Sequence, residues 1–234
     1  FGFGLLLGAI LMAMVFVVEL AFGWITISDT FVSDPIAGFG VLFAAVLIGF
    51  VFVGIYEEIL SRGYHLVNLS EGFANIKGIG PRGAIIIALT LSSLVFGLLH
   101  ASNNNATLIS TVNISLAGVL LALGMLLTGR LAIPIGLHIT WNFFQGAVFG
   151  FPVSGTRLPA SIFGIEQGGA TLVTGGPFGP EAGIIGLVAM AIGTGLTLLY
   201  VQLRYGSVEL HADLATPNLR SAARETPEDN AISL

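Results

Sequence analysis

The stretch VLFAAVLIGFVFVGIYEEILSR, residues 41–62, decides the fold, because it is apolar over a length that can cross a bilayer yet ends with two glutamates and an arginine. Two other apolar stretches carry polar groups of a similar kind, FGLLH at residues 96–100 and HITWN at residues 138–142. An ionised side chain inside a membrane costs several kcal/mol unless it is paired or has a function. Carboxylates, imidazoles and an amide on such stretches therefore indicate buried chemistry.

The composition is that of an integral membrane protein. Charged residues make up 9% of the chain and apolar residues 55%, and the mean hydropathy is +0.95, whereas about a quarter of the residues in an ordinary soluble domain are charged. The chain has no cysteine, which excludes disulfides and thiolate ligands, so His, Asp, Glu or Asn must hold any metal. The formal net charge of -5 gives no indication of nucleic-acid binding.

We expect an all-α polytopic membrane helix bundle in residues 1–204 and a polar, disordered cytoplasmic tail in residues 205–234. The chain opens inside an apolar run without Met, so native residues are expected upstream, and further spans could be among them. The second expected span is too long for one perpendicular crossing, which implies a tilted or extended helix. About six spans are expected, at residues 3–27, 36–69, 84–100, 109–128, 131–150 and 183–203.

Basic residues indicate the orientation of the expected bundle. If the first span runs outward, the inner segments hold all the Lys and Arg residues except Arg157, which places both termini of this fragment in the cytoplasm. The segment 151–182, rich in Gly and Pro, is then expected to be a flexible outer loop.

Residue spacing predicts which polar side chains share a helix face. Glu58 and Arg62 are four apart, with the acid first, which favours an ion pair that braces the helix. Glu57 is turned about 100° away from Glu58 and is left to face a cavity as a general base. His138 and Asn142 are also four apart, so they project side by side and can address one substrate atom.

Phe96 and His100 share this four-residue spacing on the third expected span, and an aromatic ring one turn from a histidine can pack on the imidazole and fix its orientation. The small residues Gly97, Gly136 and Gly146 are expected to let neighbouring helices approach closely.

The ordered motifs Glu-Glu-x-x-x-Arg, Phe-x-x-x-His and His-x-x-x-Asn, each on its own expected span, resemble the CPBP (CAAX protease and bacteriocin-processing) family of intramembrane proteases. The similarity covers about residues 41–155. The local texts GLHITWNFFQG and GFPVSG are similar to the bacterial branch of the family, which is related to type II CAAX prenyl endopeptidases. The resemblance implies a membrane helix bundle that hydrolyses peptide bonds.

The resemblance also implies roles for the motif residues. Glu57 and His100 would activate the attacking water, and His138 and Asn142 would stabilise the oxyanion or help to coordinate a metal. The two residues that would support the first helix are Glu58 and Arg62.

Cofactor and substrate stay open within this resemblance. Family members have been described both as metalloproteases and as metal-independent glutamate-type proteases, and Glu57, His100 and His138 would supply a His₂Glu set for Zn²⁺. We expect an intramembrane endopeptidase in a prokaryotic cytoplasmic membrane. Its partners are expected to be the lipid bilayer and a prenylated, leader-type or other peptide or protein substrate in or at the membrane, with no nucleic acid.

Two alternatives fit the same residues. The polar side chains could be a network that holds helices together, in a non-proteolytic immunity or scaffold protein that binds a membrane partner. Intramembrane Glu and His also mark transport pathways, so a transporter or proton relay is the second alternative. Outside the motifs we expect a structural use for Glu19, incidental roles for His65 and His211, and a solvated turn at residues 103–105.

Overall fold

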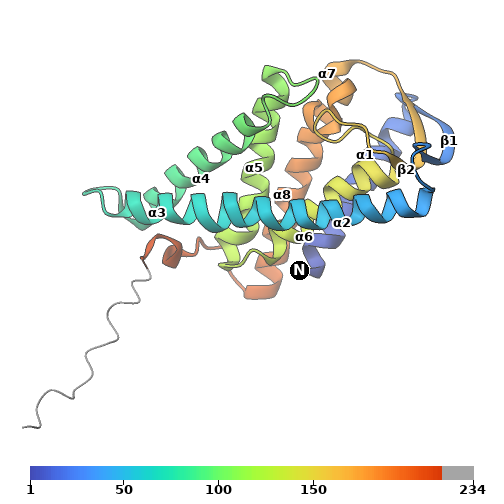
Figure 1. The fold of residues 1–234 in the computed structure, drawn as a ribbon. Helices are drawn as coiled ribbons and strands as arrows, with labels where there is room; N and C mark the ends of the chain where they lie inside the picture. The colour runs from blue at the N-terminus through green and yellow to red at the C-terminus, as the bar shows by residue number, and fades with distance from the viewer. Residues whose placement is uncertain (218–234) are drawn as a thin grey trace, which may run out of the picture.

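Long apolar helices make up most of the structure, a computed structural model that describes residues 1–217 (Figure 1). The expected all-α bundle is confirmed, with one small two-stranded sheet at its edge. The elements in chain order are α1 (Gly2–Ala21), β1 (Ile25–Ser33), α2 (Phe39–Glu58), the π-helical segment η1 (Ile59–Leu66), α3 (Val67–Ala74), α4 (Gly80–Leu99), α5 (Leu108–Thr128), α6 (Ala132–Phe143), the π-helical segment η2 (Phe144–Val148), β2 (Ala160–Gln167), α7 (Thr171–Thr174), the short helices η3 (Gly176–Phe178) and η4 (Pro180–Ala182), α8 (Ile184–Tyr205) and η5 (Ala212–Ala215).

Within residues 1–217, five helices are long and apolar enough to cross a membrane: α1, the continuous helix Phe39–Ala74, α4, α5 and α8. The expected span at 131–150 corresponds to the 12-residue α6 and the five-residue η2, which together are shorter than these five helices. We expected about six spans, and the described residues form five long helices and one shorter helical segment in their place.

The second expected span is the longest helix of the molecule. Residues Phe39–Ala74 form 36 residues of unbroken helix, which at 1.5 Å per residue is about 54 Å and exceeds the roughly 30 Å of a bilayer core. Figure 1 shows α2 and α3 running across the front of α5 and α8 instead of alongside them. The predicted tilt is consistent with this length.

The first expected span is shorter than the apolar run suggests, and residues 25–33 are a strand. Gly23 takes a left-handed φ of 68°, which ends α1. β1 then pairs antiparallel with β2, with Ile25 opposite Gln167 and Ser33 opposite Ala160. The β-branched residues in ITISDTFVS favour an extended chain. The segment 151–182, expected to be a flexible loop, instead holds β2, α7, η3 and η4.

The described part of the expected tail packs on the bundle. Ala215 is 3% exposed and belongs to a buried cluster with residues of α4 and α5, and the His211 N–H donates to the Leu126 carbonyl at 2.8 Å. Most side chains of residues 205–217 are exposed, as a solvated tail would be, but the chain is anchored to the bundle at residues 210–215 by the burial of Ala215 and the partial burial of its apolar neighbours. Residues 218–234 of the expected tail lie outside the described residues.

Close helix packing positions α6 at the centre of the bundle. A Cβ on Gly136 would lie 2.7 Å from the Phe1 carbonyl oxygen and 2.9 Å from the Leu5 nitrogen, so only glycine lets α6 lie this close to α1. Gly97 plays the same part between α4 and α5, where its Cβ would lie 2.5 Å from the Thr111 carbonyl oxygen. Gly146 contacts side chains of the following loop instead of a neighbouring helix.

Candidate active site

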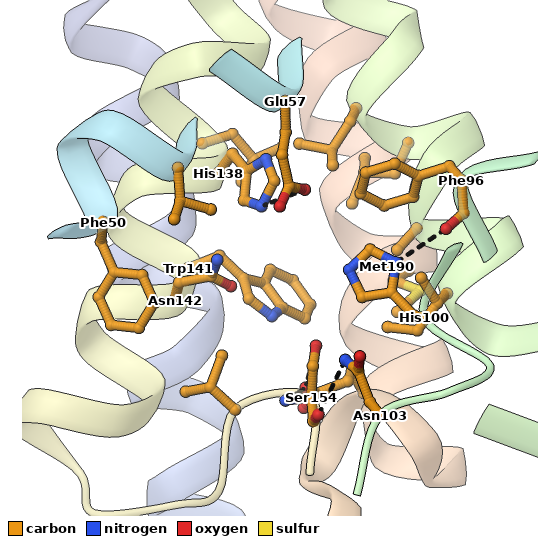
Figure 2. A pocket seen from close by; sticks show the side chains of 18 residues that line it. Phe50, Glu57, Phe96, His100, Asn103, His138, Trp141, Asn142, Ser154 and Met190 are labelled. Atoms are coloured by element: carbon orange, nitrogen blue, oxygen red, sulfur yellow. Dashed lines mark hydrogen bonds and ion pairs between the residues drawn. The ribbon is translucent and has the colours of Figure 1, made fainter. Parts of the chain in front are cut away.

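A cavity of about 210 Å³ is lined by all four side chains that the motifs predict to be catalytic (Figure 2). Glu57 comes from the last turn of α2, and His138 and Asn142 come from α6. His100 directly follows the last residue of α4. Residues from three separate helices therefore meet at one cavity, as the resemblance leads one to expect.

One oxygen of Glu58 contacts two partners. Oε1 accepts a hydrogen bond from Arg62 Nη1 at 2.9 Å and lies 2.7 Å from His138 Nδ1. The predicted Glu58–Arg62 pair is therefore present, and both side chains are almost fully buried. The contact with His138 is new, since no spacing in the sequence predicts it. An ionised carboxylate only accepts hydrogen bonds, so Nδ1 of His138 donates to Glu58 and Nε2 is the nitrogen left for other partners.

The Arg62 guanidinium also joins two further helices to this pair. Nη2 donates to the Gly118 carbonyl of α5 at 3.1 Å, and the guanidinium carbon lies 4.3 Å from the centre of the Phe96 ring of α4. A planar guanidinium can donate in several directions and stack on an aromatic face at the same time. Phe96 therefore contacts Arg62 of the Glu58–Arg62 pair as well as His100, the histidine of its own motif.

His100 is oriented by the main chain of Phe96. Nδ1 donates to the Phe96 carbonyl oxygen at 2.8 Å, because a carbonyl oxygen can only accept. The two rings lie with centroids 4.9 Å apart, as their spacing predicts. Figure 2 shows the other ring nitrogen of His100 directed into the cavity. Both imidazoles are thus fixed through Nδ1, an arrangement that orients Nε2 for proton transfer or metal binding.

Glu57 has one carboxylate oxygen held and one without a partner. Oε1 accepts a hydrogen bond from the Tyr56 hydroxyl at 3.1 Å. Oε2 is buried, has no hydrogen-bond partner among the described residues, and lies 3.9 Å from His138 Nε2, which is too long for a direct hydrogen bond. A buried acceptor without a partner is costly, so Oε2 is the oxygen of Glu57 that is free to accept a hydrogen bond from a molecule in the cavity.

Both helices that supply the acid and the histidine change to π-helix just beyond these residues. The segment η1 begins at Ile59, directly after Glu58, and η2 begins at Phe144, two residues after Asn142. Such wider turns occur often at functional sites. The backbone irregularity thus coincides with the motif residues on each helix.

Residues 39–144 match a family model whose description is type II CAAX prenyl endopeptidase Rce1-like. The matched segment contains all three motifs that line the cavity. This segment is 106 of the 234 residues, and over it the chain is similar to the Rce1-like family, as the motifs predict. Searches of curated proteins and of solved structures gave no match.

The match supports CAAX-type intramembrane protease activity in general, with a membrane-associated peptide as the substrate class, and together with the five apolar helices it indicates an integral membrane protein. It does not distinguish a metal-dependent from a glutamate-type enzyme, and it gives no support to a metalloprotease. The assignment to the bacterial branch stays a prediction.

The side chains offered as zinc ligands do not form a preassembled metal site. Within residues 1–217, no group of three His, Asp or Glu residues is close enough together to hold a metal ion. Glu57 and His138 approach each other to 3.9 Å, but with His100 they do not form a cluster of three. A Zn²⁺ ion on these three residues stays a prediction.

A further set of polar residues lines the cavity on a different side. No motif in the sequence points to these residues. Glu181 of η4 is buried and accepts hydrogen bonds from the Ser154 N–H and from the Gln145 side-chain amide. Asn103 Nδ2 donates to the Ser154 carbonyl oxygen at 3.1 Å. Asn103, Ser154 and Glu181 all line the cavity. The only sequence signal is that Glu181 is one of two acids in the Gly- and Pro-rich segment 151–182 before the last span.

Glu181 should make the stability of the fold depend on pH. Burial raises the pKa of its carboxyl from 4.5 to about 7, although hydrogen bonds from Ser154 and Gln145 lower it. Between these two values the folded chain binds more protons than the unfolded chain, so the stability from this group falls as pH rises and is lost above about pH 7. The loss should be of the order of 3 kcal/mol.

We therefore expect wild-type protein in detergent to lose thermal stability relative to Glu181→Gln between about pH 5 and about pH 8, because the amide does not titrate. The two proteins would be compared by thermal unfolding at each pH. A stability difference that stays constant across this range would contradict the assignment.

Three polar residues outside the motifs do not line the cavity. Glu19 is fully buried in α1, and neither carboxylate oxygen has a hydrogen-bond partner among the described residues. Its structural use stays a prediction. His65 of η1 and His211 before η5 lie away from the cavity lining, which agrees with the incidental roles expected for them.

Proposed function

We propose that the chain is an intramembrane endopeptidase that hydrolyses a peptide bond with a water molecule activated by Glu57 and His100. The observation that carries the proposal is the 3.9 Å gap between the unpartnered Glu57 Oε2 and His138 Nε2, in a cavity that His100 also lines. Two polar atoms at this separation can both reach one water molecule at ordinary hydrogen-bond lengths. The gap therefore leaves room for the attacking water beside Glu57, and it keeps His138 Nε2 within reach of the oxyanion that forms when this water attacks.

In the proposed reaction Glu57 is the general base. Its Oε2 takes a proton from water while the water oxygen attacks the substrate carbonyl carbon, and His100 Nε2 accepts the second hydrogen of the water and orients it. The tetrahedral intermediate then collapses as Glu57 returns the proton to the amide nitrogen. The C–N bond breaks and releases an amine and a carboxylic acid.

Asn142 and His138 are proposed to stabilise the oxyanion. The Asn142 side-chain amide can donate a hydrogen bond to it. His138 can donate from Nε2 as well when that nitrogen carries a proton, while its Nδ1 is held by Glu58 Oε1. A preorganised donor of this kind contributes about 2.7–4 kcal/mol in the best cases. Glu58 and Arg62 thus act by orienting His138.

The substrate is proposed to be a prenylated or leader-type peptide in or at a prokaryotic cytoplasmic membrane, with the chain termini on the cytoplasmic side. The walls of the cavity include the apolar side chains of Phe50, Val53 and Met190, which suit an apolar peptide segment. The distribution of Lys and Arg along the chain supports the orientation.

Cleavage in liposomes tests the proposal. Purified protein would be incubated with a farnesylated CAAX peptide and with an unprenylated leader-type peptide, and the products would be identified by mass spectrometry. We expect cleavage of at least one peptide, and a loss of about 10²-fold or more in His100→Ala and His138→Ala. Full activity in either variant would contradict the role assigned to that residue.

The same liposomes separate the alternatives. Proton or peptide flux across sealed vesicles without any cleavage would favour a transporter. Full biological function in chains that carry Glu57→Ala, His100→Ala and His138→Ala would favour a non-proteolytic scaffold or immunity protein.

A further inference from the structure

The cavity has a second polar wall, formed by Asn103, Ser154 and Glu181. In Figure 2, Ser154 and Asn103 lie across the cavity from Glu57 and His138. These residues come from the loop after α4, the loop after η2 and the short helix η4, so they belong to none of the three motifs. Glu181 and Ser154 also lie outside the segment that matches the Rce1-like family.

Glu181 holds Ser154 in an unusual backbone conformation. Ser154 has a φ of 45°, in the left-handed region that non-glycine residues seldom occupy. The Glu181 carboxyl accepts the Ser154 N–H, and it also accepts the Ser154 hydroxyl at 3.3 Å. A conformation of this kind persists only where its surroundings hold it in place.

Neighbouring contacts join the same two loops. The Gly155 N–H donates to the Phe178 carbonyl oxygen at 2.7 Å. Gly179 has a φ of 122°, and a Cβ there would lie 2.9 Å from the Gln145 amide nitrogen and would also clash with the Glu181 carboxylate. Only glycine at this position leaves room for Glu181 to reach its donors. The segment before α8 is therefore built to bring one carboxyl onto the Ser154 turn.

We propose that Glu181 is a positioning residue that holds the Ser154 turn as the wall on which the substrate main chain binds, across from the hydrolytic residues. Asn103 Oδ1 and the lone pairs of the Ser154 hydroxyl are hydrogen-bond acceptors on this wall, and an extended peptide offers N–H donors to them. The inference rests on the proposed function, because it assigns the peptide-binding side of the same cavity. Glu181 acts through Ser154 and takes no part in proton transfer.

The Glu181→Gln variant tests this role in steady-state kinetics. The amide keeps an acceptor for Ser154 but turns an NH₂ group toward the Gln145 amide, so two donors face each other and the turn is held less firmly. We expect KM for the peptide that wild-type protein cleaves to rise about tenfold, with kcat within about threefold of wild type. The matched control is Glu166→Gln, at an exposed carboxyl of β2 that does not line the cavity.

A fall in kcat as large as that in Glu57→Gln, with KM unchanged, would overturn the proposal, because Glu181 would then serve the chemistry directly. An unchanged KM and kcat would overturn it too. If Glu181→Gln fails to fold, Ser154→Ala decides the matter: it removes only the hydroxyl from the wall, and it should raise KM by about threefold or more. An unchanged KM in Ser154→Ala would contradict the proposal that the Ser154 turn binds the substrate main chain.

Binding without cleavage keeps this inference separate from the proposed function. A dye-labelled farnesylated CAAX peptide would be titrated into Glu57→Gln protein with and without Glu181→Gln. We expect Kd to rise about tenfold in the double variant. The inference stands on that rise even if wild-type protein cleaves no peptide, in which case only the proposed function fails. Cleavage by wild type with an unchanged Kd overturns the inference alone, and no binding at all contradicts both.

Discussion

Replacing Glu57 with glutamine is expected to lower kcat/KM for peptide hydrolysis by about 10²- to 10⁴-fold, the range that a positioned general base contributes. The amide has nearly the size of the carboxyl, but its NH₂ group cannot take a proton from water. The altered atom is the one that faces His138 Nε2 across 3.9 Å and has no hydrogen-bond partner among the described residues. The Tyr56 hydroxyl can still donate to the remaining oxygen, so the bundle should stay folded.

Glu71→Gln is the matched control for this prediction. Glu71 lies in α3, on the same continuous helix as Glu57, and does not line the cavity. Initial rates of cleavage in liposomes, with equal protein by quantitative gel, would compare both variants with wild type. Full activity in Glu57→Gln would end its assignment as the base. A similar loss in Glu71→Gln would show that the helix, and not the cavity, is sensitive to the change.

Helix positions were predictable where one local property sets them. Apolar length predicts α4 and α5 to within about four residues at each end, because a bilayer requires runs of that length. The same property misleads at Ile25–Ser33, which continues an apolar run but forms β1. Its partner β2 lies far along the chain, and no local periodicity reports a pairing between distant segments.

For the site too, contacts within one helix were predictable and contacts between elements were not. Four-residue spacing predicts the Glu58–Arg62 pair because both residues lie on one helix. The contact of Glu58 with His138 depends on how α2 and α6 face each other, and helical periodicity carries no information on that packing. Glu181 is harder still, since an acid in a segment rich in Gly and Pro reads as solvated until the loops are seen to bury it.

Replacing Arg62 with alanine is expected to destabilise the fold by about 3–5 kcal/mol, the usual cost of removing one partner of a buried ion pair. Glu58 is fully buried and would lose the guanidinium that pairs with its carboxylate. The Gly118 carbonyl oxygen would also lose a donor, and Phe96 would lose the cation that lies over its ring. Thermal unfolding in detergent, followed by circular dichroism, would measure the change.

The double variant Glu58→Gln/Arg62→Met distinguishes two roles of Glu58: stabilising the fold through its ion pair with Arg62, and orienting His138. Removing both charges should restore most of the stability lost in Arg62→Ala, because no unpaired charge stays buried. Hydrolysis should not recover, since the amide that replaces the Glu58 carboxylate is a weaker acceptor for His138 Nδ1 and orients the ring less firmly. A double variant that regains wild-type rates would show that Glu58 serves only to hold the helix. A double variant as unstable as Arg62→Ala would show that packing of the arginine, more than its charge, stabilises this part of the bundle.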